Sequence, residues 1–430
     1  MDLICRHWTR TLLVIFVTAL LARGAFILML QDGFYFPDST EYSAAAVNLV
    51  TKGELGAGYS RPPGYPVFLA TIYALFGQSI FATRMVESVL GAFLTLIIAL
   101  IAKRIGGEVV GALAGMLWAV YPMGVFIAGL VYPENLLAML LSLGMLCFLH
   151  PSHQDLSNKR VFLAGLLWGL ATLTKPVVLG TVGAVSLWLM FWGRGNRLLL
   201  VSMLLLGAAV TVAPWAVRDF YVYDRFVIVE PRALQHLPVM PAAEGNLKER
   251  NIQNILKHPG AFADHFQREF VNFWKVELHR ITMDWPSYRA ALHKRDSRIV
   301  QNTIFTSTGL INTVSILSTA PLFLFAIIGT AVMLFEHERR RYLALLWMTI
   351  LSFAVVYSIF YAKTRYRIPI EPYIVILSAY GMWKSWGAMK WGLRKFEVRN
   401  LQTLDGQREQ LTEPSTLSSQ PSTLNSRPEL

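Results

Sequence analysis

The stretch that decides the fold is "VLGAFLTLIIALIAKR", residues 89–104. It completes an apolar run that starts near residue 80 and continues to residue 102, where Lys103 and Arg104 follow directly. A transmembrane helix needs about 20 predominantly apolar residues, so this run is long enough to cross a bilayer. A basic pair at the end of a span is typical of its cytoplasmic side. The stretch therefore predicts both a membrane helix and its direction.

Similar apolar runs recur along the chain. Its 430 residues are 54% hydrophobic and only 15% charged, whereas soluble domains average about 25% charged residues. We predict an all-α polytopic membrane protein with about ten transmembrane helices. One long span across Lys175-Pro176, in place of two short ones, would reverse the side of every later loop. The expected spans are 10–30, 80–102, 109–127, 131–149, 160–175, 177–192, 198–216, 309–335, 342–360 and 368–388.

Basic residues gather in every second loop, which fixes the predicted orientation. Loops rich in Lys and Arg stay in the cytoplasm, so we expect both termini inside and the loops 31–79 and 217–308 outside. The formal net charge of +12 is then explained by topology, and because no basic domain stands apart from the membrane we expect no nucleic-acid partner. The basic clusters are Arg6 and Arg10, Lys103 and Arg104, Lys159 and Arg160, Arg194 and Arg197, residues 336–342, and the segment after the last span.

The two predicted parts of the chain, residues 1–392 and 393–430, differ in composition. Residues 1–392 hold all the expected spans, and we predict amphipathic helices in the two large outer loops. Residues 393–430 become rich in Ser, Thr, Pro and Gln and contain the near-repeat "PSTLSSQ" and "PSTLNSR". Such a composition cannot bury a core, so a disordered cytoplasmic tail is expected. The two cysteines, Cys5 and Cys147, imply no disulfide framework.

The first outer loop contains "PDSTEY", residues 37–42, at the start of a helical pattern. One interpretation is purely structural: Asp38 or Ser39 caps the helix and Glu41 completes a capping box. The other is chemical, because the start of a helix can also hold the Asp38 carboxylate in a fixed place facing the outer solution. Both interpretations stay open from the sequence.

Several cations lie on the predicted outer side, against the usual bias. Arg61 stands in "RPPGYP", Arg218 follows the span 198–216, and Arg365 and Arg367 crowd the loop 361–367. They could reach lipid headgroups, or they could form a site for a phosphate, which guanidinium groups bind in a bidentate manner. Glu134 and Lys175 stand at outer ends of spans, where charged groups are costly and commonly face a polar cavity.

Six motifs in one order carry a family resemblance. They are "PDSTEY" (37–42), "RPPGYP" (61–66), "YPENLLAMLLSLGMLCFL" (132–149), "GLLWGLATLTKP" (165–176), "APWAVRDFYVYDRF" (213–226) and "RYRIPIEPYIVILSAYG" (365–381). Together they resemble the C-type glycosyltransferase superfamily, in particular its bacterial dolichyl-phosphate-mannose protein mannosyltransferase-like and lipid A aminoarabinose transferase-like group. The resemblance implies a multi-pass enzyme of the bacterial cytoplasmic membrane whose site faces the periplasm or exterior.

The resemblance also implies roles for particular residues. Asp38 occupies the position of the family's catalytic base, and relatives often carry a second acid where this chain has Ser39. The candidates for binding the donor phosphate are Arg61, Arg218, Arg365 and Arg367, and the further candidates are Glu41, Tyr42, Glu134 and Lys175. The resemblance leaves a divalent metal beside the base as an open alternative, although the sequence shows no cluster of metal ligands and no cofactor is certain. The histidines of the long outer loop lack metal-ligand spacing and are expected to be solvated or structural: His236, His258, His265, His279 and His293.

The expected reaction is the inverting transfer of a sugar from a polyprenyl-phosphate carrier to an acceptor hydroxyl. Nucleotide sugars are cytoplasmic, and the chain has no Gly-rich phosphate loop, so an outer site needs a donor delivered through the membrane. Membrane lipids are the other expected partners, and the acceptor could be a lipid, a glycan or a protein. The alternatives are a transporter or flippase of lipid-linked sugars, which would have functional charges at mid-membrane, and a non-catalytic polytopic subunit.

Overall fold

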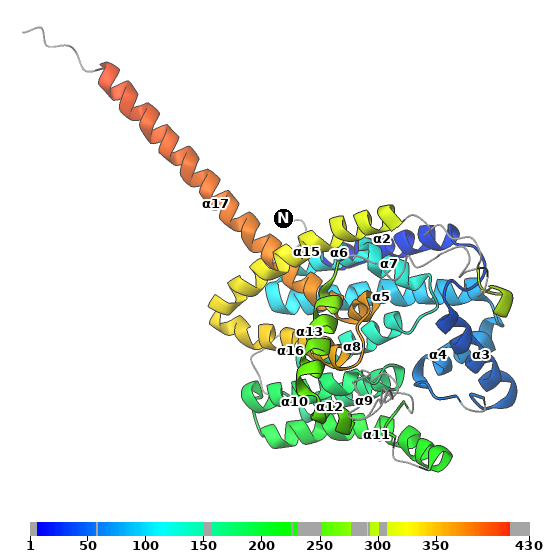
Figure 1. The fold of residues 1–430 in the computed structure, drawn as a ribbon. Helices are drawn as coiled ribbons and strands as arrows, with labels where there is room; N and C mark the ends of the chain where they lie inside the picture. Colours follow the sequence, from blue (N-terminus) through cyan, green and yellow to red (C-terminus); the bar gives the residue numbers. More distant parts are fainter. Residues whose placement is uncertain are drawn as a thin grey trace, which may run out of the picture. The chain divides into compact units, whose positions relative to one another are not determined.

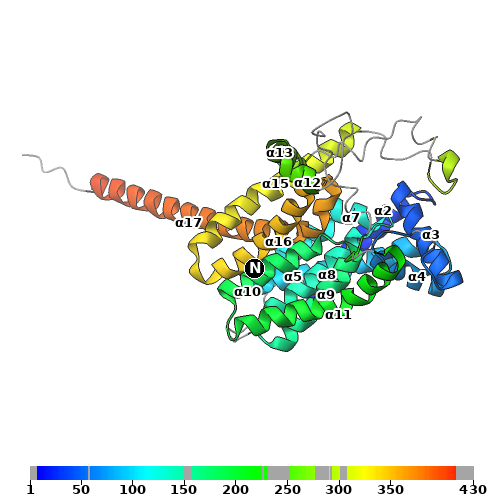
Figure 2. The same cartoon turned by 60° about the horizontal axis from the view of Figure 1, so that its bottom comes forward.

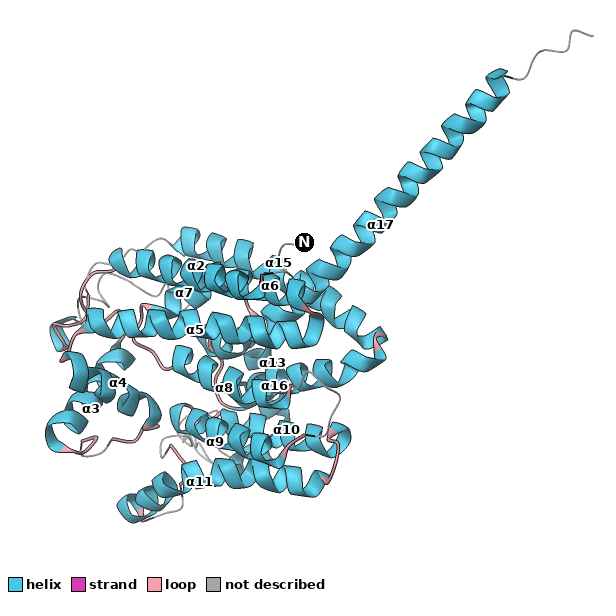
Figure 3. Ribbon diagram, turned by 180° about the vertical axis from the view of Figure 1, so that it is seen from behind, coloured by secondary structure: helices cyan, strands magenta, loops and turns pink. Residues whose placement is uncertain are grey.

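The computed structural model describes residues 7–56, 59–149, 156–224, 227–230, 252–276, 290, 293–300 and 308–412. Within these residues the chain is helical, and the one β-type pairing described is an isolated parallel bridge between Phe34 and Ile299. The predicted all-α polytopic architecture is confirmed. Figure 1 shows α2 (Trp8–Leu28), α5 (Ile80–Gly106) and α6 (Glu108–Val120) lying side by side, and Figure 3 shows the same group from behind.

Five described helices are long and apolar enough to cross a membrane, or six if a bent pair counts as one span. Two of them are α2 and α5, and the bent pair is α6 with α7 (Pro122–Ala128), which are inclined by 54°. Pro122 explains this break, since proline cannot donate the next helical hydrogen bond. Judged by helix length and composition, the described residues therefore do not confirm the predicted count of ten spans. The other three long helices are α11 (Arg197–Tyr223), α15 (Thr308–Phe335, apolar from Asn312) and the stretch His337–Ile359, which contains α16 (Arg340–Ile359).

Three of the remaining predicted spans coincide with shorter helices, and the last coincides with the first part of a long one. The shorter helices are α8 (Glu134–Phe148), α9 (Asn158–Thr174) and α10 (Val178–Trp192), and the long one is α17 (Glu371–Thr412). The chain does divide at Lys175-Pro176, because α9 ends at Thr174 and α10 begins at Val178. Proline terminates the first helix and disfavours helical geometry at the residue before it.

Helices α9 and α11 lie side by side (Figure 2), and glycines explain how closely they pack. A Cβ added to Gly165 would lie 2.3 Å from the Leu204 carbonyl oxygen, and one added to Gly207 would lie 2.3 Å from the Phe162 oxygen. Gly165 and Gly169 are four residues apart on one face of α9. This is the small-residue spacing that lets transmembrane helices approach one another.

The surfaces of the long helices carry large apolar side chains that remain exposed. In a soluble protein such surfaces would be a liability, but in a bilayer they contact lipid. On α2 and α11 only 22% and 28% of the apolar window is buried inside the protein. The fold is therefore that of a multi-pass membrane protein. Examples of exposed side chains on these helices and on α15 are Leu13, Leu21, Leu205, Leu206, Val210, Leu317, Leu324 and Ile327.

The two loops that the sequence predicts outside contain helices. The first loop folds into α3 (Pro37–Lys52) and α4 (Gly64–Phe76), and the long loop contains α12 (Ile252–Lys257) and α13 (Pro259–Trp274). A short 3₁₀ helix, η4 (Thr364–Ile370), precedes α17, and another, η3 (His337–Arg339), precedes α16. Parts of the predicted long outer loop, with His236 and His279, lie outside the described residues.

The chain divides into two units, residues 1–383 and 384–430. The first contains every helix from α2 to α16 and the start of α17. The second contains the remainder of α17, which is helical as far as Thr412. The sequence predicts an irregular chain from residue 393, whereas the structure continues the helix over residues 393–412. These residues include good helix formers such as Leu, Arg, Glu and Gln. Residues 413–430, which hold the near-repeat, lie outside the described residues.

Candidate active site

Asp38 lies in the first turn of α3, and its carboxylate does not cap that helix. The N-cap residue is Phe36, in an extended conformation and with no side-chain cap, and Pro37 opens the helix. Proline suits this position because its missing N–H would have no helical partner there. The capping-box interpretation is therefore wrong: Ser39 donates to the Leu130 carbonyl oxygen at 3.0 Å, and Glu41 pairs with Arg61. The Asp38 carboxylate is left for other partners.

Two arginines from distant parts of the chain meet Asp38. Arg365 of η4 donates from Nη2 to Asp38 Oδ2 at 2.7 Å. Arg61, which precedes α4, donates from Nη2 to Asp38 Oδ1 at 3.3 Å and from Nε to Glu41 Oε2 at 2.7 Å. Each carboxylate oxygen of Asp38 thus accepts from a different guanidinium. The structure brings together three of the predicted residues, Asp38, Arg61 and Arg365, and places Glu41 beside them.

Tyr132 completes this cluster, and the sequence did not single it out. Its hydroxyl donates to Asp38 Oδ2 at 3.2 Å and accepts from Arg365 Nη1 at 2.7 Å. The Arg365 guanidinium also lies over the Tyr132 ring, 4.6 Å from its centroid. The available signal was the position of Tyr132 two residues before Glu134 in the turn between two apolar helices. Tyr42, by contrast, is buried on α3 with Arg61 over its ring at 5.4 Å.

The charges around Asp38 set its acidity. Burial alone would raise the pKa of the carboxyl, but the positive charges of Arg365 and Arg61 outweigh burial and lower the pKa to about 2. Arg365 is largely buried, which by itself would lower its pKa, yet the surrounding tyrosines and acids hold the pKa well above its usual value. Asp38 and Arg365 are therefore both charged at neutral pH.

Glu134 and Lys175 form a second pair beside the first. Lys175 Nζ lies 2.6 Å from Glu134 Oε1, and the Glu134 side chain is fully buried. Tyr366 links this pair to the cluster, because Lys175 lies 4.7 Å and Arg365 lies 5.4 Å from the centroid of its ring. Glu134 Oε2 has no hydrogen-bond partner among the described residues. A buried acceptor of this kind is costly unless something else satisfies it.

The two other predicted arginines lie elsewhere. Arg218 pairs with Asp219 at 2.7 Å and lies over the Trp215 ring. Arg367 is almost fully buried, pairs with Glu371 at 2.8 Å, and donates to two backbone carbonyls, those of Phe273 and Lys275. In the part of the chain that the structure describes, neither arginine contacts Asp38. The contacts of Arg367 are those of a residue that holds η4 against α13.

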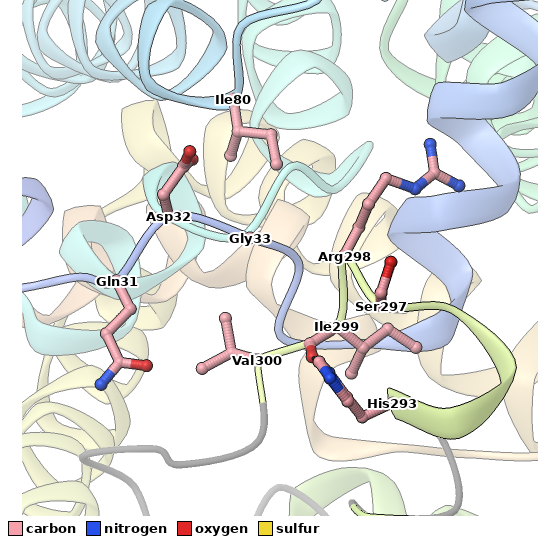
Figure 4. Close-up of a pocket in the computed structure, with 9 residues that line it drawn as sticks. All are labelled: Gln31, Asp32, Gly33, Ile80, His293, Ser297, Arg298, Ile299 and Val300. Carbon is pink, nitrogen blue, oxygen red and sulfur yellow. The ribbon is translucent and has the colours of Figure 1, made fainter.

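A surface cavity of about 370 Å³ lies near the start of the first outer loop. Figure 4 shows that it is bordered by residues 31–33 on one side and by the segment 297–300 on the other. Asp38, Arg61 and Arg365 are not among the residues that line it. The cavity is thus a feature separate from the carboxylate–arginine cluster.

The acids of the site already have cationic side chains as partners. Asp38 pairs with two arginines, Glu41 with Arg61, and Glu134 with Lys175. A cation bound to these oxygens would have to displace positive side chains that already neutralise them. Within the described ranges, His, Cys, Asp and Glu side chains form no group of three or more that could hold a metal ion.

The chain is similar to known proteins over part of its sequence and in its fold. Residues 60–217 match the sequence model of a family described as dolichyl-phosphate-mannose-protein mannosyltransferase. No curated protein matches the chain significantly. The family match and the structural matches below confirm the resemblance that the six motifs predict, to the C-type glycosyltransferases of the mannosyltransferase and ArnT group.

Solved structures share the fold at low sequence identity. ArnT from Cupriavidus metallidurans bound to undecaprenyl phosphate is 18% identical with a TM-score of 0.57, and the match covers 90% of this chain and 62% of ArnT. Archaeoglobus fulgidus oligosaccharyltransferase with zinc and sulfate is 13% identical, with a TM-score of 0.55 and coverages of 89% and 50%. The archaeal oligosaccharyltransferase AglB from the same organism, with an inhibitory peptide and a dolichol-phosphate, is 14% identical, with a TM-score of 0.53 and coverages of 91% and 52%. The chain therefore spans between 50% and 62% of the length of these proteins.

Proposed function

We propose that this protein transfers a sugar from a polyprenyl-phosphate carrier to an acceptor hydroxyl outside the cytoplasm. The observation that carries the proposal is the Asp38 carboxylate held between Arg365 and Arg61. A carboxylate can take the proton of an attacking hydroxyl, and guanidinium groups can stabilise a phosphate that leaves. The lipid phosphates bound by ArnT and AglB support a lipid-linked donor for a chain with their fold.

The proposed reaction is a single displacement with inversion. The acceptor oxygen attacks the anomeric carbon on the face opposite the phosphate, and its proton passes to Asp38. The bond between the anomeric carbon and the phosphate oxygen breaks, and the electron pair leaves with the carrier phosphate. Arg365 and Arg61 offset the charge that grows on that phosphate. Help from a general base typically gives about 10²–10⁴-fold in rate, and fixed cations contribute a comparable amount or more.

The low pKa of Asp38 indicates how donor binding prepares the site. A carboxylate with a pKa of about 2 is a weak base at neutral pH. When a donor phosphate takes hydrogen bonds from Arg365 and Arg61, their positive charge is shared, and the pKa of Asp38 rises. The base is then strengthened only when its substrate is present.

The arrangement of α5 supports an outer location for this chemistry. Near one end of the helix, Arg84 donates to the carbonyl oxygens of Gln31 and Gly33 in the first loop. The basic pair Lys103 and Arg104 lies in the last turn at the other end. A helix of 27 residues is about 40 Å long, which is enough to separate two faces of a bilayer. Under the positive-inside rule this arrangement supports the proposal that the basic pair is cytoplasmic and Asp38 lies outside. The alternation of basic loops along the sequence supports cytoplasmic termini.

The decisive experiment measures transfer by purified protein in lipid nanodiscs. The protein is given radiolabelled sugars on polyprenyl phosphate together with bacterial membrane extract, and release from the carrier is followed. Asp38→Asn should lower turnover by about 10²-fold or more while inserting and melting like the parent. Glu54→Gln is the matched control, because Glu54 is an exposed acid of the same loop. Transfer by Asp38→Asn at the parental rate would remove Asp38 from the role of base.

A further inference from the structure

The turn that precedes α8 contains an unusual backbone conformation. Val131 has φ +56°, and in the described ranges the other non-glycine residue with positive φ is Asp224. Aspartate tolerates the left-handed region, but a β-branched valine there is a genuine outlier. Strained residues of this kind persist only where the surrounding structure determines them, and they cluster at functional sites.

Contacts from two helices fix this turn. Arg84 of α5 donates from Nε to the Gly129 carbonyl oxygen at 2.9 Å. Ser39 of α3 donates to the Leu130 oxygen at 3.0 Å. Val131 itself is 1% exposed. The strained residue is thus held by hydrogen bonds on its N-terminal side and by packing around its side chain.

The residue presented by this turn is Tyr132. Its ring packs edge-on against Phe36, with centroids 5.7 Å apart, and the following Pro133 restricts its backbone to extended conformations. Its hydroxyl contacts both Asp38 and Arg365. Ser39 and Asp38 are neighbours on α3, so the turn and the proposed base are tied together twice, once through Leu130 and once through Tyr132.

We infer that Tyr132 is a positioning residue for the proposed transfer, and that the strained turn at Val131 serves to hold it. The inference rests on the proposed function of Asp38. The Tyr132 hydroxyl fixes the orientation of the Asp38 carboxylate when Arg365 turns part of its hydrogen bonding toward a donor phosphate. Without this hydroxyl, the carboxylate would lose its one neutral hydrogen-bond donor among the described residues and could rotate away from the acceptor.

The first test compares Tyr132→Phe with Tyr73→Phe. Tyr73 is a matched control because its buried hydroxyl also bonds to α3, but to Ser43 rather than to Asp38. Tyr132→Phe should lower kcat by about 10–100-fold, the effect of misplacing a reacting group, with less than about a threefold change in donor KM. With saturating donor, its acid limb of kcat should move to higher pH, because a hydrogen bond to the ionised carboxylate is lost. Tyr73→Phe should change neither kcat nor the acid limb of its pH profile.

The second test uses Val131→Gly, which accepts positive φ without strain. We expect its thermal midpoint to fall, because the buried Val131 side chain is lost. Turnover should also fall at temperatures well below that midpoint, where the protein is still folded, because the turn no longer fixes Tyr132. A purely structural role would make activity follow stability instead. If Asp38→Asn is inactive but Tyr132→Phe keeps parental kcat and pH dependence, the positioning inference is wrong and the proposed function stands. If Asp38→Asn is itself fully active, both are wrong.

Discussion

The Arg365 guanidinium reaches the Asp38 carboxylate at 2.7 Å although 327 residues separate them in the chain. This contact joins the first outer helix to the segment before the last apolar helix. It also determines the chemistry of Asp38, because Arg365 is the largest favourable charge acting on that carboxyl. A substitution of Arg365 should therefore produce a measurable change in the pKa of Asp38.

Replacing Arg365 with Gln should make the activity more sensitive to acid. The folded-state pKa of Asp38 is lowered to about 2 by Arg365 and Arg61 against the effect of burial. Without Arg365, fewer positive charges oppose the effect of burial, the pKa of Asp38 rises, and the base is protonated at a higher pH. The acid limb of kcat/KM should then move upward, and turnover should fall because the leaving phosphate loses a cation. Measurement of the pH–rate profile checks the direction, and a limb that stays in place would contradict the assigned cause.

Substitutions of Arg61 and Arg367 should affect different properties: the first should weaken donor binding, and the second should lower the free energy of unfolding. Arg61 is partly exposed beside Asp38 and Glu41, so Arg61→Gln should raise the donor KM and cost less than about 1 kcal/mol of folding free energy. Arg367→Gln would leave the Glu371 carboxylate buried without its cation, which costs about 3–5 kcal/mol. Donor titrations and thermal unfolding in the same detergent provide both quantities. A normal melting temperature with weakened donor binding in Arg367→Gln would instead assign Arg367 to the phosphate.

Some of these relationships could be predicted from the sequence, and others could not. The apolar runs and the basic pair at Lys103 indicate spans and direction, because bilayer thickness and charge bias act on local sequence. The prediction that Asp38 and Arg365 both lie outside follows from the same rules. Their contact does not follow from them, since it depends on how α3 and η4 pack. Tyr132 was missed for this reason. The capping box was wrong because Phe36 and Pro37 start the helix, which frees Asp38 for the arginines.

The buried pair of Glu134 and Lys175 predicts a stability effect. Lys175→Met removes the cation and leaves the fully buried Glu134 carboxylate uncompensated, so we expect a loss of about 3–5 kcal/mol. Lys103→Met is the control, since the pair of Lys103 with Glu108 keeps a quarter or more of each side chain exposed and should cost less than about 1 kcal/mol. Thermal unfolding in detergent compares the two. Restoration of stability in the double variant Lys175→Met with Glu134→Gln would attribute the loss to the unpaired charge.

Gly33→Ala should loosen the segment 297–300 from the first outer loop. Gly33 has φ +130°, and an added Cβ would lie 2.7 Å from the Arg298 carbonyl oxygen and 2.8 Å from Val300 Cγ2. The same Arg298 oxygen accepts the Phe34 N–H at 2.7 Å, so relief of the clash must weaken the bridge between Phe34 and Ile299. We therefore expect faster proteolytic cleavage near residue 298 and a lower melting temperature.

Gly53→Ala is the matched control for this variant. Gly53 also has a positive φ, +74°, but an added Cβ would meet nothing within 4 Å. Its substitution should cost only the left-handed backbone penalty of about 1–2 kcal/mol, with no change in cleavage near residue 298. Because Gly33 carries both the backbone penalty and the clash, equal cleavage rates in the two alanine variants would show that the close approach at Gly33 does not hold this segment in place.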